Sequence, residues 1–110
     1  MRRATVFAAL LLVAVAACGW KAEAEEQLRE GCQQLADVPY GTAGWDRASE
    51  EAWDAFHHAA DLDDRWNTVA IAHDRLRRVP PDAPTDEVRA ELEAWAAAIG
   101  TECEKVNVTL

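Results

Sequence analysis

Motifs that mark many enzymes and cofactor proteins are missing from this sequence. It has no GxSxG nucleophile turn, no HExxH zinc motif and no glycine-rich phosphate loop. Its three cysteines form neither a CxxC pair nor a CxxCH haem-attachment motif. The acidic residues are numerous and scattered, so no pair of catalytic carboxylates can be identified. We therefore expect a protein that is not an enzyme and that needs no cofactor.

Basic residues are scarce compared with acidic ones. The chain has 11 Lys and Arg against 20 Asp and Glu, for a formal net charge of −9. A surface with this excess of negative charge repels phosphate backbones and anionic lipid headgroups. We therefore do not expect nucleic acid as a partner, and a contact with a membrane would need something other than charge.

Long hydrophobic runs are also absent, apart from one near the start. The run Ala4–Ala17 has 14 residues and follows Arg2 and Arg3. A permanent membrane span needs about 20 apolar residues, so this run is too short for one. A positive start, a short apolar middle and small residues at the end predict a secretory signal peptide.

The end of this run carries a more specific pattern. Val15, Ala16, Ala17 and Cys18 follow one another, and this resembles the lipobox of bacterial lipoproteins. The resemblance covers the first eighteen residues only. It implies that residues 1–17 are removed, that Cys18 is acylated on its sulfur, and that the protein is exported and anchored on the outer face of the cell membrane or in the outer membrane.

Residues 18–110 would then form a single domain held at the membrane by lipid. Loss of Arg2 and Arg3 takes the formal charge from −9 to −11. Two cysteines remain, Cys32 and Cys103, and an oxidising compartment makes a disulfide the first expectation for them. A bridge between them would close a loop of about 70 residues. In chain-entropy models, closing such a loop adds about 4 kcal/mol to the free energy of unfolding. A free thiol and a metal site are the competing interpretations.

Helix-breaking residues are sparse within the domain. Neither glycine nor proline occurs from Trp45 to Val79. In Trp20–Asp37 and again after Thr85, apolar residues recur at spacings of three or four residues, which places them on one face of a helix. We predict an all-α fold with helices at Trp20–Asp37, in the middle segment and after a Thr85 cap, a loop at Val38–Gly44, and a tail at Lys105–Leu110 that frays.

A seven-residue repeat runs through the middle segment. One seam holds Trp45, Ala52, Ala59, Trp66 and His73, and the other holds Ala48, Ala55, Leu62, Val69 and Leu76. Its phase continues across Asp61–Asp64, which favours one long helix, or two helices in register, with Asp46 as N-cap. A straight helix here would be about 50 Å long, so a kink or break near Asp61 is the alternative.

The expected disulfide restricts the topology. Bridged cysteines need Cα atoms within about 7 Å of each other. Cys32 lies late in the first helix and Cys103 late in the last, which favours helices that run the same way. Alternating directions give that for three helices. We therefore predict a small three-helix bundle with a long middle helix and one disulfide, with a four-helix bundle as the alternative.

Three aromatic residues are candidates for binding a partner. Tyr40 lies in the predicted loop, and Trp53 and Phe56 form an apolar strip with Ala60 beside the two seams. Exposed aromatics with an acidic rim would mark a binding patch, whereas a helix that touches two neighbours would bury the strip. We favour burial for the strip, and expect the domain to bind an envelope protein or a ligand.

Two other functions stay open at this stage. His57 and Asp61 are four residues apart, and with His73 they suggest metal or ligand handling, although two ligands are too few for a stable site. His73 occupies an inward seam, which predicts a hydrogen-bonded core histidine, and His57 and His58 are expected at the surface. The size and acidity also suit an inhibitor or immunity-type envelope protein.

Overall fold

The structure is a computed structural model that describes the backbone of residues 2–79 and 85–110, and the side chains of residues 19–79 and 85–110. Within these ranges the chain forms α-helices and one short 3₁₀ helix, with no strand, so the predicted all-α fold is confirmed. The elements are α1 (Arg2–Ala36), α2 (Trp45–Leu62), η1 (Asp64–Trp66), α3 (Asn67–Arg78) and α4 (Asp86–Glu104). The side chains of the expected signal peptide and of Cys18 lie outside these ranges.

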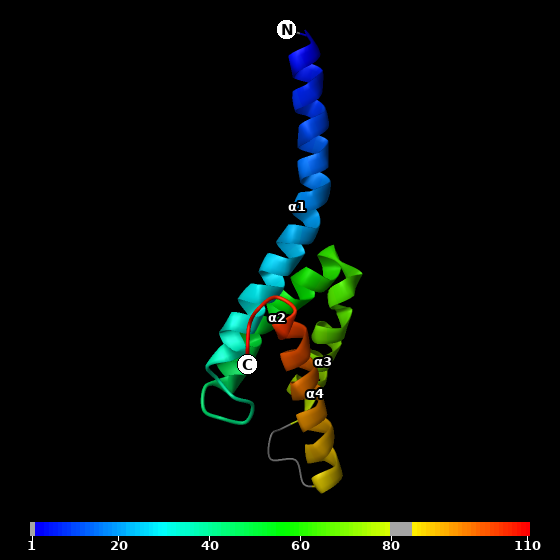
Figure 1. The fold of residues 1–110 in the computed structure, drawn as a ribbon. Helices are drawn as coiled ribbons and strands as arrows, with labels where there is room; N and C mark the ends of the chain where they lie inside the picture. The colour runs from blue at the N-terminus through cyan, green and yellow to red at the C-terminus, as the bar shows by residue number, and fades with distance from the viewer. Residues whose placement is uncertain (1, 80–84) are drawn as a thin grey trace.

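The four α-helices of the described chain alternate in direction (Figure 1). Helix α1 packs mainly against α2, and α3 packs mainly against α4, so the fold consists of two antiparallel pairs. The first half of α1 extends beyond the other helices (Figure 1). Helix α1 therefore leaves the domain at one end.

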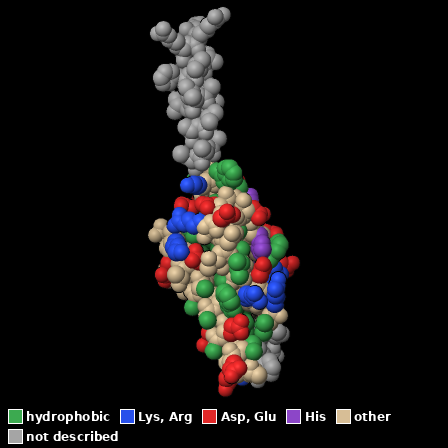
Figure 2. Space-filling model, turned by 90° about the vertical axis from the view of Figure 1, so that its right-hand side faces the viewer, with side chains coloured by type: hydrophobic (Ala, Val, Ile, Leu, Met, Phe, Trp, Pro, Cys, Tyr) green, Lys and Arg blue, Asp and Glu red, His purple; other side chains and the backbone are tan. Residues whose placement is uncertain are grey.

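The surface of the described side chains is mixed in character. On the face in Figure 2, acidic and basic side chains are interspersed with hydrophobic ones. Among residues 19–79 and 85–110, no helix has the length and apolar character needed to cross a membrane.

The predicted long middle helix is broken at Asp63. This residue is extended, with φ −149° and ψ 115°, and its N–H still donates to the Ala59 carbonyl at the end of α2. Its carboxylate accepts from the Arg65 N–H at 3.1 Å, which starts η1. The break near Asp61 is thus confirmed, and the chain reverses there and returns as α3.

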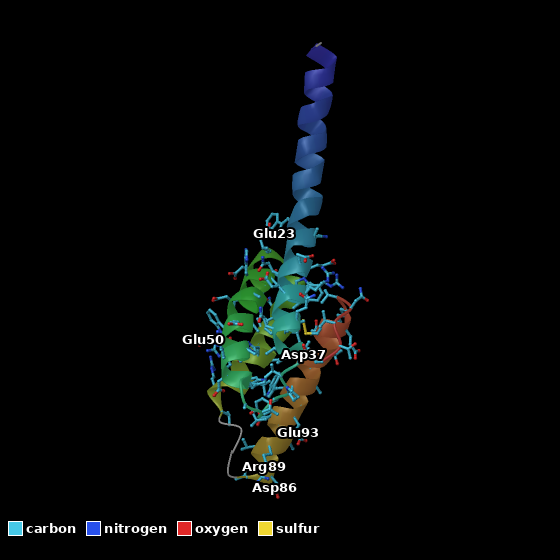
Figure 3. The ribbon with its side chains drawn as sticks, turned by 90° about the vertical axis from the view of Figure 1, so that its left-hand side faces the viewer. Glu23, Asp37, Glu50, Asp86, Arg89 and Glu93 are labelled. Atoms are coloured by element: carbon cyan, nitrogen blue, oxygen red, sulfur yellow. A yellow bond between two sulfur atoms is a disulfide. The ribbon has the colours of Figure 1, made fainter. Side chains whose placement is uncertain are left out.

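The predicted three-helix arrangement is not confirmed. Cys32 and Cys103 form the expected disulfide, with Cα atoms 5.7 Å apart, but α1 and α4 run in opposite directions (Figure 3). Figure 3 also shows that α4 begins at Asp86, at the far end from Glu23 of α1. Because α4 is shifted along the domain axis, only the two C-terminal ends meet, and the bridge joins them there.

The core confirms the apolar patterns of the sequence. The apolar stripe of α1 is buried and consists of Ala24, Leu28, Cys32 and Leu35. All members of the two seams are buried as well, except the half-buried Leu62. Gly31 lets α1 approach α2 closely, because a Cβ there would lie 2.7 Å from the Phe56 ring. This contact needs the smallest residue at position 31.

Two predicted helix caps have different outcomes. The Thr85 hydroxyl accepts from the Val88 N–H at 3.2 Å, so the predicted cap of α4 is confirmed. Asp46 is not the N-cap of α2, because Gly44 occupies that position with φ 87°. Asp46 instead lies in the first turn, where the positive end of the helix dipole stabilises its negative charge.

The prediction that the tail frays is wrong. Asn107 adopts the left-handed conformation, with φ 64°. The Val108 N–H donates to the Cys103 carbonyl, and the Asn107 N–H donates to the Glu104 carbonyl. This is a Schellman motif, in which an apolar residue after the left-handed position packs back on the helix. Val106 and Val108 are accordingly buried and belong to the core.

Candidate functional site

An apolar cavity lies at the end of the domain opposite to the one from which α1 leaves. Its volume is about 270 Å³, and it is partly open to solvent. Every element except η1 contributes to it, and its walls include Leu35, Val38, Tyr40, Trp45, Leu76 and Ile99. None of its lining side chains is charged, so this is a site for apolar contact and not for ionic recognition.

Tyr40 supplies a polar group to this wall. It lies in the loop between α1 and α2, and its ring meets Trp45 edge-on at a centroid distance of 4.9 Å. The hydroxyl is buried and has no hydrogen-bond partner among the described residues. Burial raises the pKa of Tyr40, so the hydroxyl keeps its proton. An unpaired buried donor of this kind costs about 1–3 kcal/mol.

A second feature joins α2 to α3 at the surface. The Trp53 indole N–H donates to Asp74 Oδ1 at 2.8 Å, and His57 Nε2 lies 3.0 Å from the same oxygen. The Trp53 and His57 rings stack with centroids 4.2 Å apart. These hydrogen bonds hold the pKa of Asp74 below its usual range despite the opposing effect of burial. The Trp53 side chain is therefore fixed in place while 37% exposed.

A buried serine and histidine form the third feature. Ser49 Oγ lies 2.8 Å from His73 Nε2, within reach for proton transfer. Burial, helped by Arg77, lowers the pKa of His73 to about 4, so the imidazole is neutral at pH 7. His73 Nδ1 has no partner in the described residues, so no third group orients the ring as in a catalytic triad. The predicted hydrogen-bonded core histidine is confirmed.

The structure separates the three predicted partner-binding residues. Phe56, a candidate for binding a partner, is fully buried against Gly31 and His73, so its side chain is not exposed at the surface. The preferred core interpretation of the strip holds for Phe56 and Ala60 but not for Trp53. Tyr40 lines the cavity, while Trp53 belongs to the cluster with Asp74.

The suggested metal ligands are not assembled. His57 pairs with Asp74, whereas Asp61 lies exposed near the end of α2 and His73 bonds to Ser49. Within residues 19–79 and 85–110, no three His, Cys, Asp or Glu side chains are grouped so that they could hold a metal ion. Sequence reasoning missed Asp74 and most of the cavity wall, since both depend on contacts between helices distant in the chain.

Comparison with known proteins adds no relative to this picture. No family model, no curated protein and no solved structure matches the chain.

Proposed function

We propose that this chain is an exported lipoprotein whose domain, residues 18–110, works as a non-catalytic binding module at the outer side of a bacterial membrane. In this proposal Cys18 carries the lipid, and the module binds an envelope protein or a ligand. The observation that carries the proposal is the pattern Val15-Ala16-Ala17-Cys18 just ahead of the folded domain.

The helix that follows the anchor supports this role. Helix α1 continues without interruption from Cys18 to Ala36, so no flexible spacer separates the lipid from the domain. Trp20, two residues beyond the anchor, is 57% exposed, which suits a tryptophan in the headgroup layer. The acidic domain would extend away from anionic headgroups along the axis of α1.

The cavity then faces the aqueous compartment. At a rise of 1.5 Å per residue, the helix between Cys18 and Leu35 spans about 25 Å. Leu35 lines the cavity, so the cavity lies well beyond the headgroups. A module built in this way would meet molecules outside the membrane, not the bilayer interior.

The surroundings of Ser49 support a role without catalysis. Its hydroxyl and the His73 ring are both buried, in contact with each other and without a third orienting group. A serine nucleophile needs access to a carbonyl carbon and donors for the developing oxyanion. We assign this pair instead to the packing of α2 on α3.

The anchor is tested by cell fractionation of wild type and Cys18→Ala, with Trp20→Ala as a control that leaves the lipobox intact. We expect wild type and Trp20→Ala in the membrane fraction, with a diacylated Cys18 at the amino terminus by mass spectrometry. Cys18→Ala should lose the lipid. An unmodified amino terminus at another residue would refute the anchor.

The non-catalytic role is tested with a fluorophosphonate, which labels activated serines. We expect no labelling of the purified protein. Labelling that disappears in Ser49→Ala but persists in Thr42→Ala would show a reactive serine and overturn this part of the proposal.

A further inference from the structure

We infer that a second copy of this chain binds to the outer face of α2 and α3, centred on Trp53, with the two copies side by side and in the same orientation. This deepens the proposed binding role by naming a partner. It rests on that proposal only for the membrane that brings the copies together.

Two large apolar side chains are exposed on this face. Of the large hydrophobic residues exposed in the described part of the chain, Trp20 lies next to the expected anchor and Leu110 ends the chain. The other two are Trp53 on α2 and Ile71 on α3. They lie on the same face, because Trp53 bonds to Asp74, which is one turn from Ile71 on α3. Exposed large apolar side chains that are neighbours on a surface are typical of a protein interface.

Trp53 is held in place before any partner arrives. Its indole N–H donates to Asp74 at 2.8 Å, and its ring stacks on His57. The guanidinium of Arg77 lies 5.9 Å from the centroid of the same ring. A side chain that is already fixed loses little conformational entropy on binding. Tryptophan and arginine are also enriched among the residues that contribute most to binding in protein interfaces.

The charged side chains beside Trp53 are divided between the two helices. The exposed residues Asp46 and Glu50 make the start of α2 acidic, and the exposed Arg77 and Arg78 make the end of α3 basic. All four line one hollow of the surface, so they lie at the same level along the helices. Figure 3 shows Glu50 at the outer edge of the domain, near the end of α3. None of the four belongs to an ion pair of the described residues, which leaves their charges for a partner.

This division makes the face complementary to itself. A two-fold axis parallel to the helices places α2 of each copy opposite α3 of the other, at the same level. Asp46 and Glu50 of one copy then face Arg77 and Arg78 of the second copy, and the contact occurs twice in the dimer. A purely acidic partner would meet the two carboxylates, and a purely basic one would meet the two guanidinium groups. A second copy avoids both conflicts.

The same charges disfavour the opposite orientation of the two copies. A two-fold axis perpendicular to the helices would place the start of α2 opposite the C-terminal end of α2 in the second copy, where Asp61 is exposed. Asp46 and Glu50 would then meet another carboxylate, and like charges weaken binding. The parallel arrangement also directs α1 of both copies to the same side, as two lipid anchors in one membrane require.

The length of the face indicates a weak dimer that a membrane would favour. Helix α2 has 18 residues and α3 has 12, so the face extends about 27 Å along one helix and about 18 Å along the other. Such a face is small compared with the interfaces of permanent dimers. Copies confined to one membrane in one orientation have a high effective concentration, which offsets the small contact.

The test exchanges charges between two copies. Full-length exported protein is labelled at its C-terminus with a donor or an acceptor dye and inserted in phosphatidylcholine vesicles, where energy transfer at several protein-to-lipid ratios gives an apparent Kd. One variant is Asp46→Lys/Glu50→Lys, and the other is Arg77→Glu/Arg78→Glu. Each variant alone brings like charges together, so its apparent Kd should rise about tenfold or more. When the two variants are mixed, opposite charges face each other again, and the apparent Kd should return close to the wild-type value.

Recovery in the mixture requires contact between copies, because the charges within each chain stay reversed and a misfolded chain does not recover. Trp53→Ala should raise the apparent Kd about tenfold or more, as expected for a residue at the centre of an interface. The control is Glu30→Lys/Glu93→Lys, which makes the same change in charge at exposed positions of α1 and α4 and should leave the apparent Kd unchanged. Circular dichroism verifies the fold of each variant.

The proposal is overturned if wild type shows no more energy transfer than randomly mixed molecules, or if the mixture stays as weak as each charge variant alone. An unchanged apparent Kd for Trp53→Ala would also refute this face as the interface. Flotation of the same vesicles reports on the anchor separately. A chain that does not float is measured in solution at millimolar concentration, so a failure of the anchor and a failure of the dimer are told apart.

Discussion

Cys32 and Cys103 are joined although their helices run in opposite directions, and their Cα atoms lie 5.7 Å apart. Apart from this bridge, α1 and α4 make few contacts with each other compared with those within the α1–α2 and α3–α4 pairs. The disulfide therefore connects the α1–α2 pair to the α3–α4 pair at a place where packing between α1 and α4 contributes little.

Removal of this bridge should lower the free energy of unfolding substantially. For Cys32→Ala/Cys103→Ala we expect a loss of about 4 kcal/mol, because the two cysteines are 71 residues apart in the chain and the unfolded state regains the entropy of a large loop. Urea denaturation followed by circular dichroism measures it. Reduced wild type should match the double variant, and an unchanged midpoint in both would contradict the prediction.

The alternation of helices shows how far the sequence could predict the topology. The seven-residue repeat keeps its phase through Asp63, and its members are buried on both sides of the break. A repeat reports only which side of a helix faces the core, and α2 and α3 face the same core after the chain reverses. The pattern is therefore the same for one long helix and for two antiparallel ones.

The offset of α4 was beyond the reach of sequence reasoning for a related reason. The inference of parallel first and last helices assumed that helices in a bundle overlap along their full length. In the structure α4 is displaced, so two C-terminal ends meet in antiparallel helices (Figure 3). The packing of α3 on α4 sets this displacement, and it leaves no local signal in the sequence.

Gly31 in α1 and Gly100 in α4 both lie within helices. Alanine at Gly31 tests the packing of α1 on α2, and alanine at Gly100 is the matched control. Gly31→Ala should lower the free energy of unfolding by about 1–2 kcal/mol, since the new methyl group would meet the buried Phe56 ring at 2.7 Å, outweighing a gain in helix propensity of about 1 kcal/mol. A Cβ at Gly100 meets nothing within 4 Å. Gly100→Ala should therefore stabilise the protein by about 0.5–1 kcal/mol.

Chemical denaturation of Gly31→Ala and Gly100→Ala measures the change in the free energy of unfolding for each. A second substitution, Phe56→Leu, should reduce the effect of Gly31→Ala, because the smaller side chain yields space to the methyl group. Equal stabilisation by both glycine substitutions would show that the close contact at Gly31 is absent in solution.

The backbone of Asn107 leads to a further prediction. Asn107→Ala should destabilise the protein by about 1 kcal/mol, because alanine pays a larger penalty than asparagine in the left-handed region. Asn107→Gly should be neutral or slightly stabilising. Amide hydrogen exchange of Val108, whose N–H donates to Cys103, should accelerate only in the alanine variant. Fast exchange in wild type would mean that the tail frays after all.

Asparagine before an apolar residue at a helix end was a local signal for this motif, so the tail could have been predicted correctly. The binding residues were harder. Tyr40 was recognisable as an aromatic in a loop, whereas Phe56 and Trp53 differ only in which part of the α2 surface reaches α1. Gly31 creates the space that buries Phe56, and this pairing between helices cannot be read from α2 alone.

Buried His73 makes stability depend on pH. Its pKa is about 4 in the folded protein against 6.5 for an exposed histidine, because burial and Arg77 oppose the charge more than Asp74 favours it. Between these pH values the unfolded chain binds more protons than the folded one, so stability rises with pH. The contribution is complete above pH 6.5 and is lost as the pH falls towards 4.

We expect His73 to remove about 3 kcal/mol from the free energy of unfolding between pH 7 and pH 4. Urea denaturation at intervals across this range measures the slope, and His73→Gln should make it shallower by a similar amount, since glutamine does not titrate. Asp74 acts in the same direction, because its pKa is lowered in the fold, so the contribution of His73 is taken from the difference between wild type and His73→Gln. His58→Gln, at an exposed position on α2, should retain the wild-type slope. If His73→Gln retains it as well, the imidazole accepts its proton within the fold, and the buried neutral state described here is wrong.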